Sequence, residues 1–213
     1  MQDGIFALIR LDLIFEIISG IIALVVTFYA TKAYNLTGQK KLSDLSTGFL
    51  VLSAGMFGRV IGTWYFIIRY GIEGPSSELI LSIVTIAYGA SRIMAYLLFV
   101  VATRPARHRE SLNNENMTGV SLLLAATILV DPNLEVIAIL VLVLVVIQAI
   151  INYFSTRSRF ALYVLLGFSL ILLSHMLVAQ TLVNPGLFLL SQISQLLGYL
   201  SLLVMLIKAG RVE

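Results

Sequence analysis

The chain has 213 residues, of which 59% are hydrophobic and 12% are charged, and its formal net charge at pH 7 is +3. Soluble domains carry roughly a quarter charged residues, so the composition excludes an ordinary soluble domain and indicates an integral membrane protein. The chain contains no cysteine, which excludes disulfides, thiolate metal sites and cysteine nucleophiles.

Seven apolar segments are expected to form transmembrane helices, because only hydrogen-bonded backbone is stable in lipid. In chain order they cover residues 5–33, 45–70, 77–103, 117–130, 134–154, 160–182 and 186–209. The segment 117–130 is short: it rises only ~21 Å, whereas a bilayer core is ~30 Å thick. The predicted fold is a single all-α polytopic membrane domain.

The distribution of charge predicts the orientation of these helices, since lysine and arginine accumulate on the cytoplasmic side. With seven spans and the N-terminus outside, ten basic residues are cytoplasmic: Lys32, Lys40, Lys41, Arg104, Arg107, Arg109, Arg157, Arg159, Lys208 and Arg211. The outside segments contain only Arg69, together with Asp3, Glu73, Glu78, Asp131 and Glu135. Omitting the short fourth helix would place Arg157 and Arg159 outside. We therefore expect a multi-pass protein of the cell membrane, N-outside and C-inside.

The chain contains an internal similarity. The segment 91–100 (SRIMAYLLFV) returns in relaxed form at 194–203 (SQLLGYLSLL), and GFLVLS at 48–53 resembles GFSLILLS at 167–174. The similar segments keep their order and their orientation. We therefore predict two parallel repeats, 5–103 and 134–209, joined by the linker helix 117–130.

This 3+1+3 plan resembles that of the SWEET and PQ-loop transporters, and the helix count is similar to that of microbial rhodopsins. The chain has no proline–glutamine pair, and its four prolines lie in connections. Lys208 is the only lysine of the last segment. It lies at the cytoplasmic end, away from the mid-membrane position that a retinal Schiff base needs. The resemblance therefore concerns the arrangement and number of the helices, which this chain is expected to share with these families.

Among the charged residues of the first three predicted helices, we single out four: Asp12, Glu16, Arg59 and Arg92. Charges in hydrocarbon are costly and face the bundle interior, so each is a candidate site residue. Asp12 and Glu16 are one helical turn apart and share a face. We expect them to form a buried network with Arg59 and Arg92, which either fixes the three helices together or anchors a ligand or ion.

Three further polar residues, His175, Gln192 and Gln195, fall in the outer half of the last two helices, roughly 9–14 Å deep. A polar stripe on the third helix faces the same region: Ser82, Thr85, Gly89, Arg92 and Tyr96. We expect a polar cavity bounded by the second, third, sixth and seventh helices. His175 is either a ligand contact in it or bonded to a neighbouring helix.

No catalytic residue, metal site or cofactor is predicted. Haem ligation within a bundle needs two intramembrane histidines, and the second histidine, His108, lies in a cytoplasmic loop. A metal site lacks ligands for the same reason. Serines have no partner at helical spacing that could activate them. We expect the protein not to be an enzyme.

Basic residues form a cytoplasmic rim, which determines topology and can bind anionic lipid headgroups: Lys40, Lys41, Arg104, Arg107, His108 and Arg109. Other expected partners are the bilayer, a membrane protein or further copies of the chain, and no nucleic acid.

Two functions remain open. The first is a non-catalytic small-ligand sensor, receptor-like module or accessory subunit of a membrane complex; its plan resembles the membrane-embedded sensory modules of kinases. The second is a transporter of a small, possibly anionic solute. In it Arg59 and Arg92 would anchor the solute and Glu16 would carry a proton.

Overall fold

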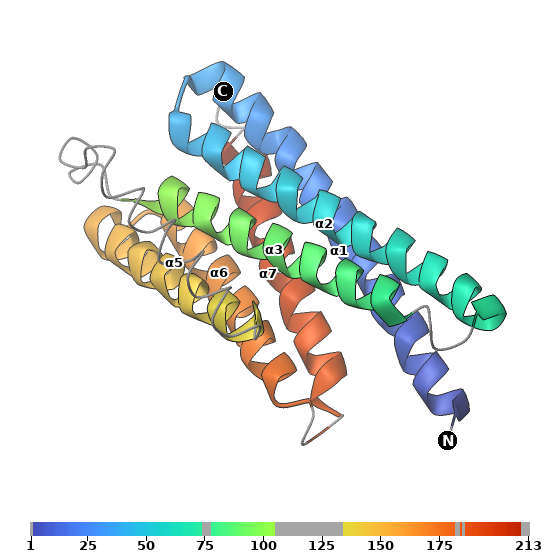
Figure 1. Cartoon of the computed structure of the whole chain (residues 1–213). Helices are drawn as coiled ribbons and strands as arrows, with labels where there is room; N and C mark the ends of the chain where they lie inside the picture. Colours follow the sequence, from blue (N-terminus) through green and yellow to red (C-terminus); the bar gives the residue numbers. More distant parts are fainter. Residues whose placement is uncertain (1, 74–77, 105–133, 182–183, 185, 210–213) are drawn as a thin grey trace.

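The computed structural model describes residues 2–73, 78–104, 134–181, 184 and 186–209 of the chain, and every regular element among them is a helix (Figure 1). The elements are α1 (Gln2–Thr37), α2 (Lys40–Glu73), α3 (Glu78–Thr103), α5 (Leu134–Thr156), α6 (Arg159–Ala179) and α7 (Leu187–Ala209). The predicted all-helical class is confirmed, and six of the seven predicted helices are present. The predicted helix 117–130 lies outside the described residues.

All six helices are long and apolar enough to cross a membrane. Large apolar side chains cover the outside of the bundle; Phe28, Ile61, Leu140 and Phe154 are all more than half exposed. Apolar surface of this extent around a helical bundle is a lipid-contacting surface rather than a water-contacting one. The six apolar helices and their exposed apolar side chains thus indicate a membrane-embedded protein.

The helices form a closed ring in the order α1, α2, α3, α5, α6, α7, and α7 returns to α1. The first turn of α1 and the last turn of α7 lie at opposite ends of this ring (Figure 1). We call the end at which α1 begins the N-terminal end. The other is the basic end, because seven described basic residues gather there: Lys32, Lys40, Lys41, Arg104, Arg157, Arg159 and Lys208.

Helices α3 and α5 run in the same direction. The other pairs of consecutive described helices are antiparallel. Near the beginning of α5, Glu135 bonds to Arg92 of α3. Further along both helices, the Thr103 hydroxyl donates to Gln148 at 2.8 Å, and Asn152 donates to the Thr103 carbonyl. Both helices therefore advance toward the basic end, as Figure 1 also shows.

Two short turns join helices at the basic end. α1 extends to Thr37, beyond its predicted end, since the turn to α2 takes only Gly38 and Gln39. Gly38 has a φ of +67°, and its N–H donates to the Tyr34 carbonyl, which closes the helix as a left-handed C-terminal glycine does. The turn from α5 to α6 has the same form, with Arg157 at a φ of +46°.

The centre of the ring is filled by five aromatic side chains without any exposed surface: Phe49, Tyr96, Phe99, Phe168 and Tyr199. The rings of Phe49 and Phe99 are 4.7 Å apart, and those of Phe99 and Phe168 are 5.3 Å apart. Their packing depends on glycine: a Cβ on Gly48 would lie 2.5 Å from the Phe99 ring. We call this set the aromatic layer.

Candidate functional site

The structure gathers all seven residues singled out from the sequence into one cavity of about 310 Å³. It lies between the aromatic layer and the N-terminal end. It is lined by Asp12, Glu16, Arg59, Thr85, Tyr88, Arg92, Glu135, Ser174, His175, Val178, Thr181, Phe188, Gln192 and Gln195. All six helices contribute to the wall, whereas the sequence predicted four. We call this space the N-terminal cavity.

Arg59 of α2 holds the two acidic residues of α1. It donates from Nη2 to Asp12 at 2.6 Å and from Nη1 to Glu16 at 2.7 Å. Asp12 also accepts a bond of 3.1 Å from the amide of Gln192 on α7. This part of the predicted network is present: the Arg59 guanidinium joins α2 to α1, and the Asp12 carboxylate joins α1 to α7.

The sequence predicted that Arg92 would pair with Asp12 and Glu16. In the structure it pairs with another residue. Its Nη2 donates to Glu135 of α5 at 2.5 Å. Counting residues from the predicted helix ends could not identify this partner, because that count assigned Glu135 to the outside segments. In the structure α5 begins level with the middle of α3, since Leu134 packs on Gly89. Glu135 therefore lies at the depth of Arg92.

His175 continues this second cluster toward the aromatic layer. Its Nδ1 lies 2.5 Å from Glu135, and its Nε2 lies 2.6 Å from the hydroxyl of Tyr96. The side chain is almost fully buried. His175 thus both lines the cavity and bonds to neighbouring helices, and the sequence had left these two roles as alternatives.

The ring of Tyr88 lies between the two clusters. The Arg59 guanidinium is 5.0 Å from its centroid and the Arg92 guanidinium is 5.2 Å from it, both within cation–π range. One aromatic side chain thereby contacts both cations of the cavity wall. Gln195 completes the wall and donates to the buried Tyr199 hydroxyl at 3.0 Å.

Sequence reasoning missed the roles of Glu135, Tyr88 and Tyr199. For Glu135 a signal existed. It is separated from Glu16 by 119 residues, and the same separation relates Gly48 to Gly167, which the sequence analysis had already aligned. Extending that alignment without a gap would have placed Glu135 in the register of Glu16.

The cavity carries more negative than positive formal charge. Asp12, Glu16 and Glu135 face the guanidiniums of Arg59 and Arg92, so the lining residues sum to −1 when all five are ionised and His175 is neutral. One carboxylate oxygen, Glu16 Oε1, is buried without a hydrogen-bond partner. Such an oxygen costs free energy until a donor reaches it.

Within the described residues, no group of three or more histidine, cysteine or acidic side chains could hold a metal ion. His108 lies outside them.

No protein-family model, curated protein or solved structure matches this chain.

Proposed function

We propose that the chain is a multi-pass protein of the cell membrane with its N-terminus outside. It binds a small ligand in the N-terminal cavity without transforming it. It acts as a sensor, a receptor-like module or an accessory subunit of a membrane complex. The observation that carries this proposal is the convergence of every intramembrane charge identified from the sequence on one cavity. Buried charges that converge from four helices, α1, α2, α3 and α5, are typical of a site.

The cavity favours a cationic ligand, such as a protonated amine, over an anionic one. Both arginines are already paired with carboxylates, so an anion would have to displace an acidic side chain. A cation would neutralise the excess negative charge and give Glu16 Oε1 the donor that it lacks. Pairing and hydrogen bonding are what make a buried charge tolerable.

Binding without catalysis fits the environment of His175. Its two ring nitrogens are taken by Glu135 and Tyr96, which leaves neither free to activate a nearby hydroxyl such as that of Ser174. A general base must reach the proton that it removes.

The predicted repeat and a seventh span belong to the same proposal. Parallel α3 and α5 support a further crossing between them, because the chain must return from the basic end before α5 begins. The repeat is supported by matched features 119 residues apart: Glu16 and Glu135, the left-handed Gly38 and Arg157, and the closely packed Gly48 and Gly167.

The test is ligand-induced stabilisation of the purified full-length chain. Protonated ethanolamine and tetramethylammonium serve as cationic probes, with acetate and phosphate as anionic controls. We expect the cations to raise the unfolding temperature of the wild type and to lose this effect in Glu16→Gln, while Lys32→Gln at the basic end responds like the wild type. Stabilisation by the anions alone, or by none of the probes, contradicts the proposal.

A transporter remains the second candidate, favoured by one observation. A second pocket, of about 350 Å³, lies on the other side of the aromatic layer at the basic end. Two cavities on one axis, separated by one layer of side chains, are the arrangement that alternating access requires. Uptake of labelled ethanolamine into proteoliposomes, abolished in Glu16→Gln, would favour this candidate over the sensor.

A further inference from the structure

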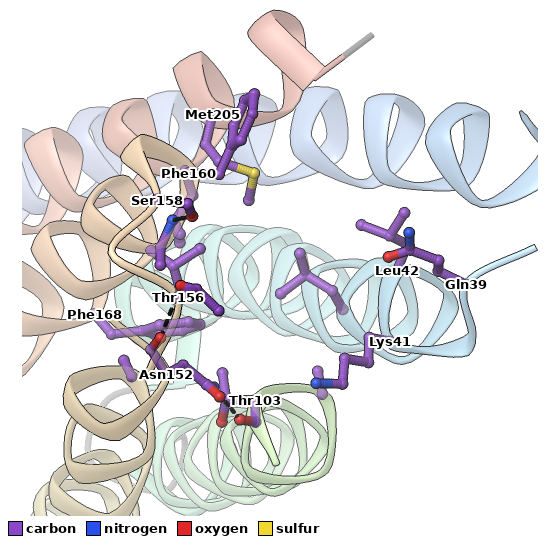
Figure 2. Close-up of a pocket in the computed structure, with 16 residues that line it drawn as sticks. Gln39, Lys41, Leu42, Thr103, Asn152, Thr156, Ser158, Phe160, Phe168 and Met205 are labelled. Carbon is purple, nitrogen blue, oxygen red and sulfur yellow. Dashed lines mark hydrogen bonds between the residues drawn. The ribbon is translucent and has the colours of Figure 1, made fainter. Parts of the chain in front are cut away.

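The basic end contains a partly open pocket of about 350 Å³ whose lining differs from that of the N-terminal cavity (Figure 2). Five helices, α2, α3, α5, α6 and α7, contribute to its wall. Its volume lies in the range of small-molecule sites. We call it the basic-end pocket.

The floor of this pocket is apolar. It is formed by Phe168 of the aromatic layer together with Leu202 and Met205 of α7. Small side chains, among them Ala102 and Ala149, leave the space open between the helices. An apolar chain would be removed from lipid or water here and would meet only side-chain carbon and sulfur.

The polar groups of the wall bond within the protein. Asn152 donates to the Thr103 carbonyl, the Thr156 hydroxyl donates to the Asn152 carbonyl at 2.8 Å, and the Ser158 hydroxyl accepts from the Ala161 N–H at 3.1 Å, as Figure 2 shows. They sit toward the helix ends, away from Phe168. The pocket is therefore polar at its mouth and apolar at its base.

Lys41 is the one charged residue among the described residues that line the pocket. In Figure 2 its amino group points from α2 toward Thr103 and Asn152. Lys40, Arg104 and Arg159 lie at the same end and Asp44 lies one turn after Lys41 on α2, so positive charge predominates around the pocket mouth. No acidic side chain of the described chain lines this pocket, in contrast to the N-terminal cavity.

We propose that the basic-end pocket binds a single-chain anionic amphiphile, namely an acyl chain that ends in a carboxylate. The acyl chain lies against Val164 and Met205, above the buried Phe168 and Leu202, and the carboxylate lies at the mouth beside Lys41. The apolar base supplies the hydrophobic contact, and the lysine supplies a charge-assisted bond. Binding inside this pocket goes beyond the contact between lipid headgroups and the basic rim, and it does not depend on the ligand of the N-terminal cavity.

The experiment uses the full-length chain in proteoliposomes and dodecanoate with a photoreactive diazirine near its methyl end. After illumination, mass spectrometry maps the labelled residues. We expect label on Val164 and Met205, two apolar residues of the pocket wall that keep some exposed surface. Unlabelled dodecanoate should compete at least fivefold better than dodecanol or dodecyltrimethylammonium at equal concentration. Of the three competitors, only dodecanoate carries a negatively charged head.

Two variants test the part played by the lysine. Lys41→Gln should reduce labelling of these residues at least fivefold, whereas Lys40→Gln, its exposed neighbour, should stay within twofold of the wild type. Ala149→Phe, checked for an unchanged unfolding temperature, should block labelling by filling the space. Label confined to outward-facing residues such as Leu166, equal labelling of the two lysine variants, or equal competition by dodecanol would overturn the proposal.

Discussion

Glu16 and Glu135 face the same cavity from different halves of the chain, and each accepts a hydrogen bond from a different arginine. Arg59 and Arg92, their partners, lie on adjacent helices and share the ring of Tyr88. The second half of the chain thus supplies one of the acids, while the first half supplies both cations. This asymmetry makes the cavity a single site rather than two equal ones.

The pair between Arg92 and Glu135 should be strongly coupled. Arg92→Gln alone leaves a carboxylate and His175 without their cation, and we expect it to lower the free energy of unfolding by about 3 kcal/mol. The double variant Arg92→Gln/Glu135→Gln should recover part of this loss, since no charge is then left unpaired. Unfolding in a denaturing detergent measures both, and additive losses would contradict a direct pair.

The excess negative charge should govern ligand choice. Glu16→Gln removes it and keeps the shape of the side chain, so the affinity for protonated ethanolamine should fall about tenfold, which corresponds to about 1.4 kcal/mol. Calorimetric titration of the purified chain measures this. An unchanged affinity would place the cation elsewhere, with Lys32→Gln as the control for a change of net charge alone.

Two glycines of α2 should respond oppositely to alanine. A Cβ on Gly48 would meet the Phe99 ring at 2.5 Å, whereas one on Gly58 would meet no atom within 4 Å. Gly48→Ala should therefore destabilise the bundle by about 1–3 kcal/mol through overpacking. Gly58→Ala should be neutral or stabilise by up to about 1 kcal/mol through helix propensity. Equal effects of the two variants would show that the packing at Gly48 is looser than the structure has it.

The turn between α5 and α6 should tolerate glycine better than its native residue. Arg157 has a φ of +46°, in the left-handed region that favours glycine. Arg157→Gly should stabilise the protein by about 0.5–1 kcal/mol, and Arg157→Asn by less. At the matching position, Gly38→Ala should destabilise. Thermal unfolding compares the three variants, and a loss of stability in Arg157→Gly would argue against the strain.

Single cysteines can test the topology, because the natural chain has none. Lys40→Cys and Ser158→Cys lie at the basic end, and Asn184→Cys lies at the N-terminal end. In sealed cells an impermeant maleimide should label Asn184→Cys only, and permeabilisation should expose the other two. Labelling of Lys40→Cys and Ser158→Cys from different sides would rule out the seventh crossing, and labelling of both from outside would invert the orientation.

Much of the fold was readable from the sequence. Runs of apolar residues near the length of a bilayer gave the six described helices with ends within a few residues, since lipid permits hardly any other backbone. The cost of burying charge also singled out Asp12, Glu16, Arg59 and Arg92 as interior residues. These predictions depend on local composition alone, and a linear sequence carries that information in full.

The pairing of those charges was decided only in three dimensions. Counting residues from helix ends assumes that all helices begin at one level, but α5 begins level with Gly89, in the middle of α3. That offset brings Glu135 to Arg92 and leaves Arg59 to Asp12 and Glu16. The sequence by itself identified Asp12, Glu16, Arg59 and Arg92 as residues that face inward. Helix stagger and the order of the ring determined which of them meet, because ion pairs form only where side chains reach the same depth on facing helices.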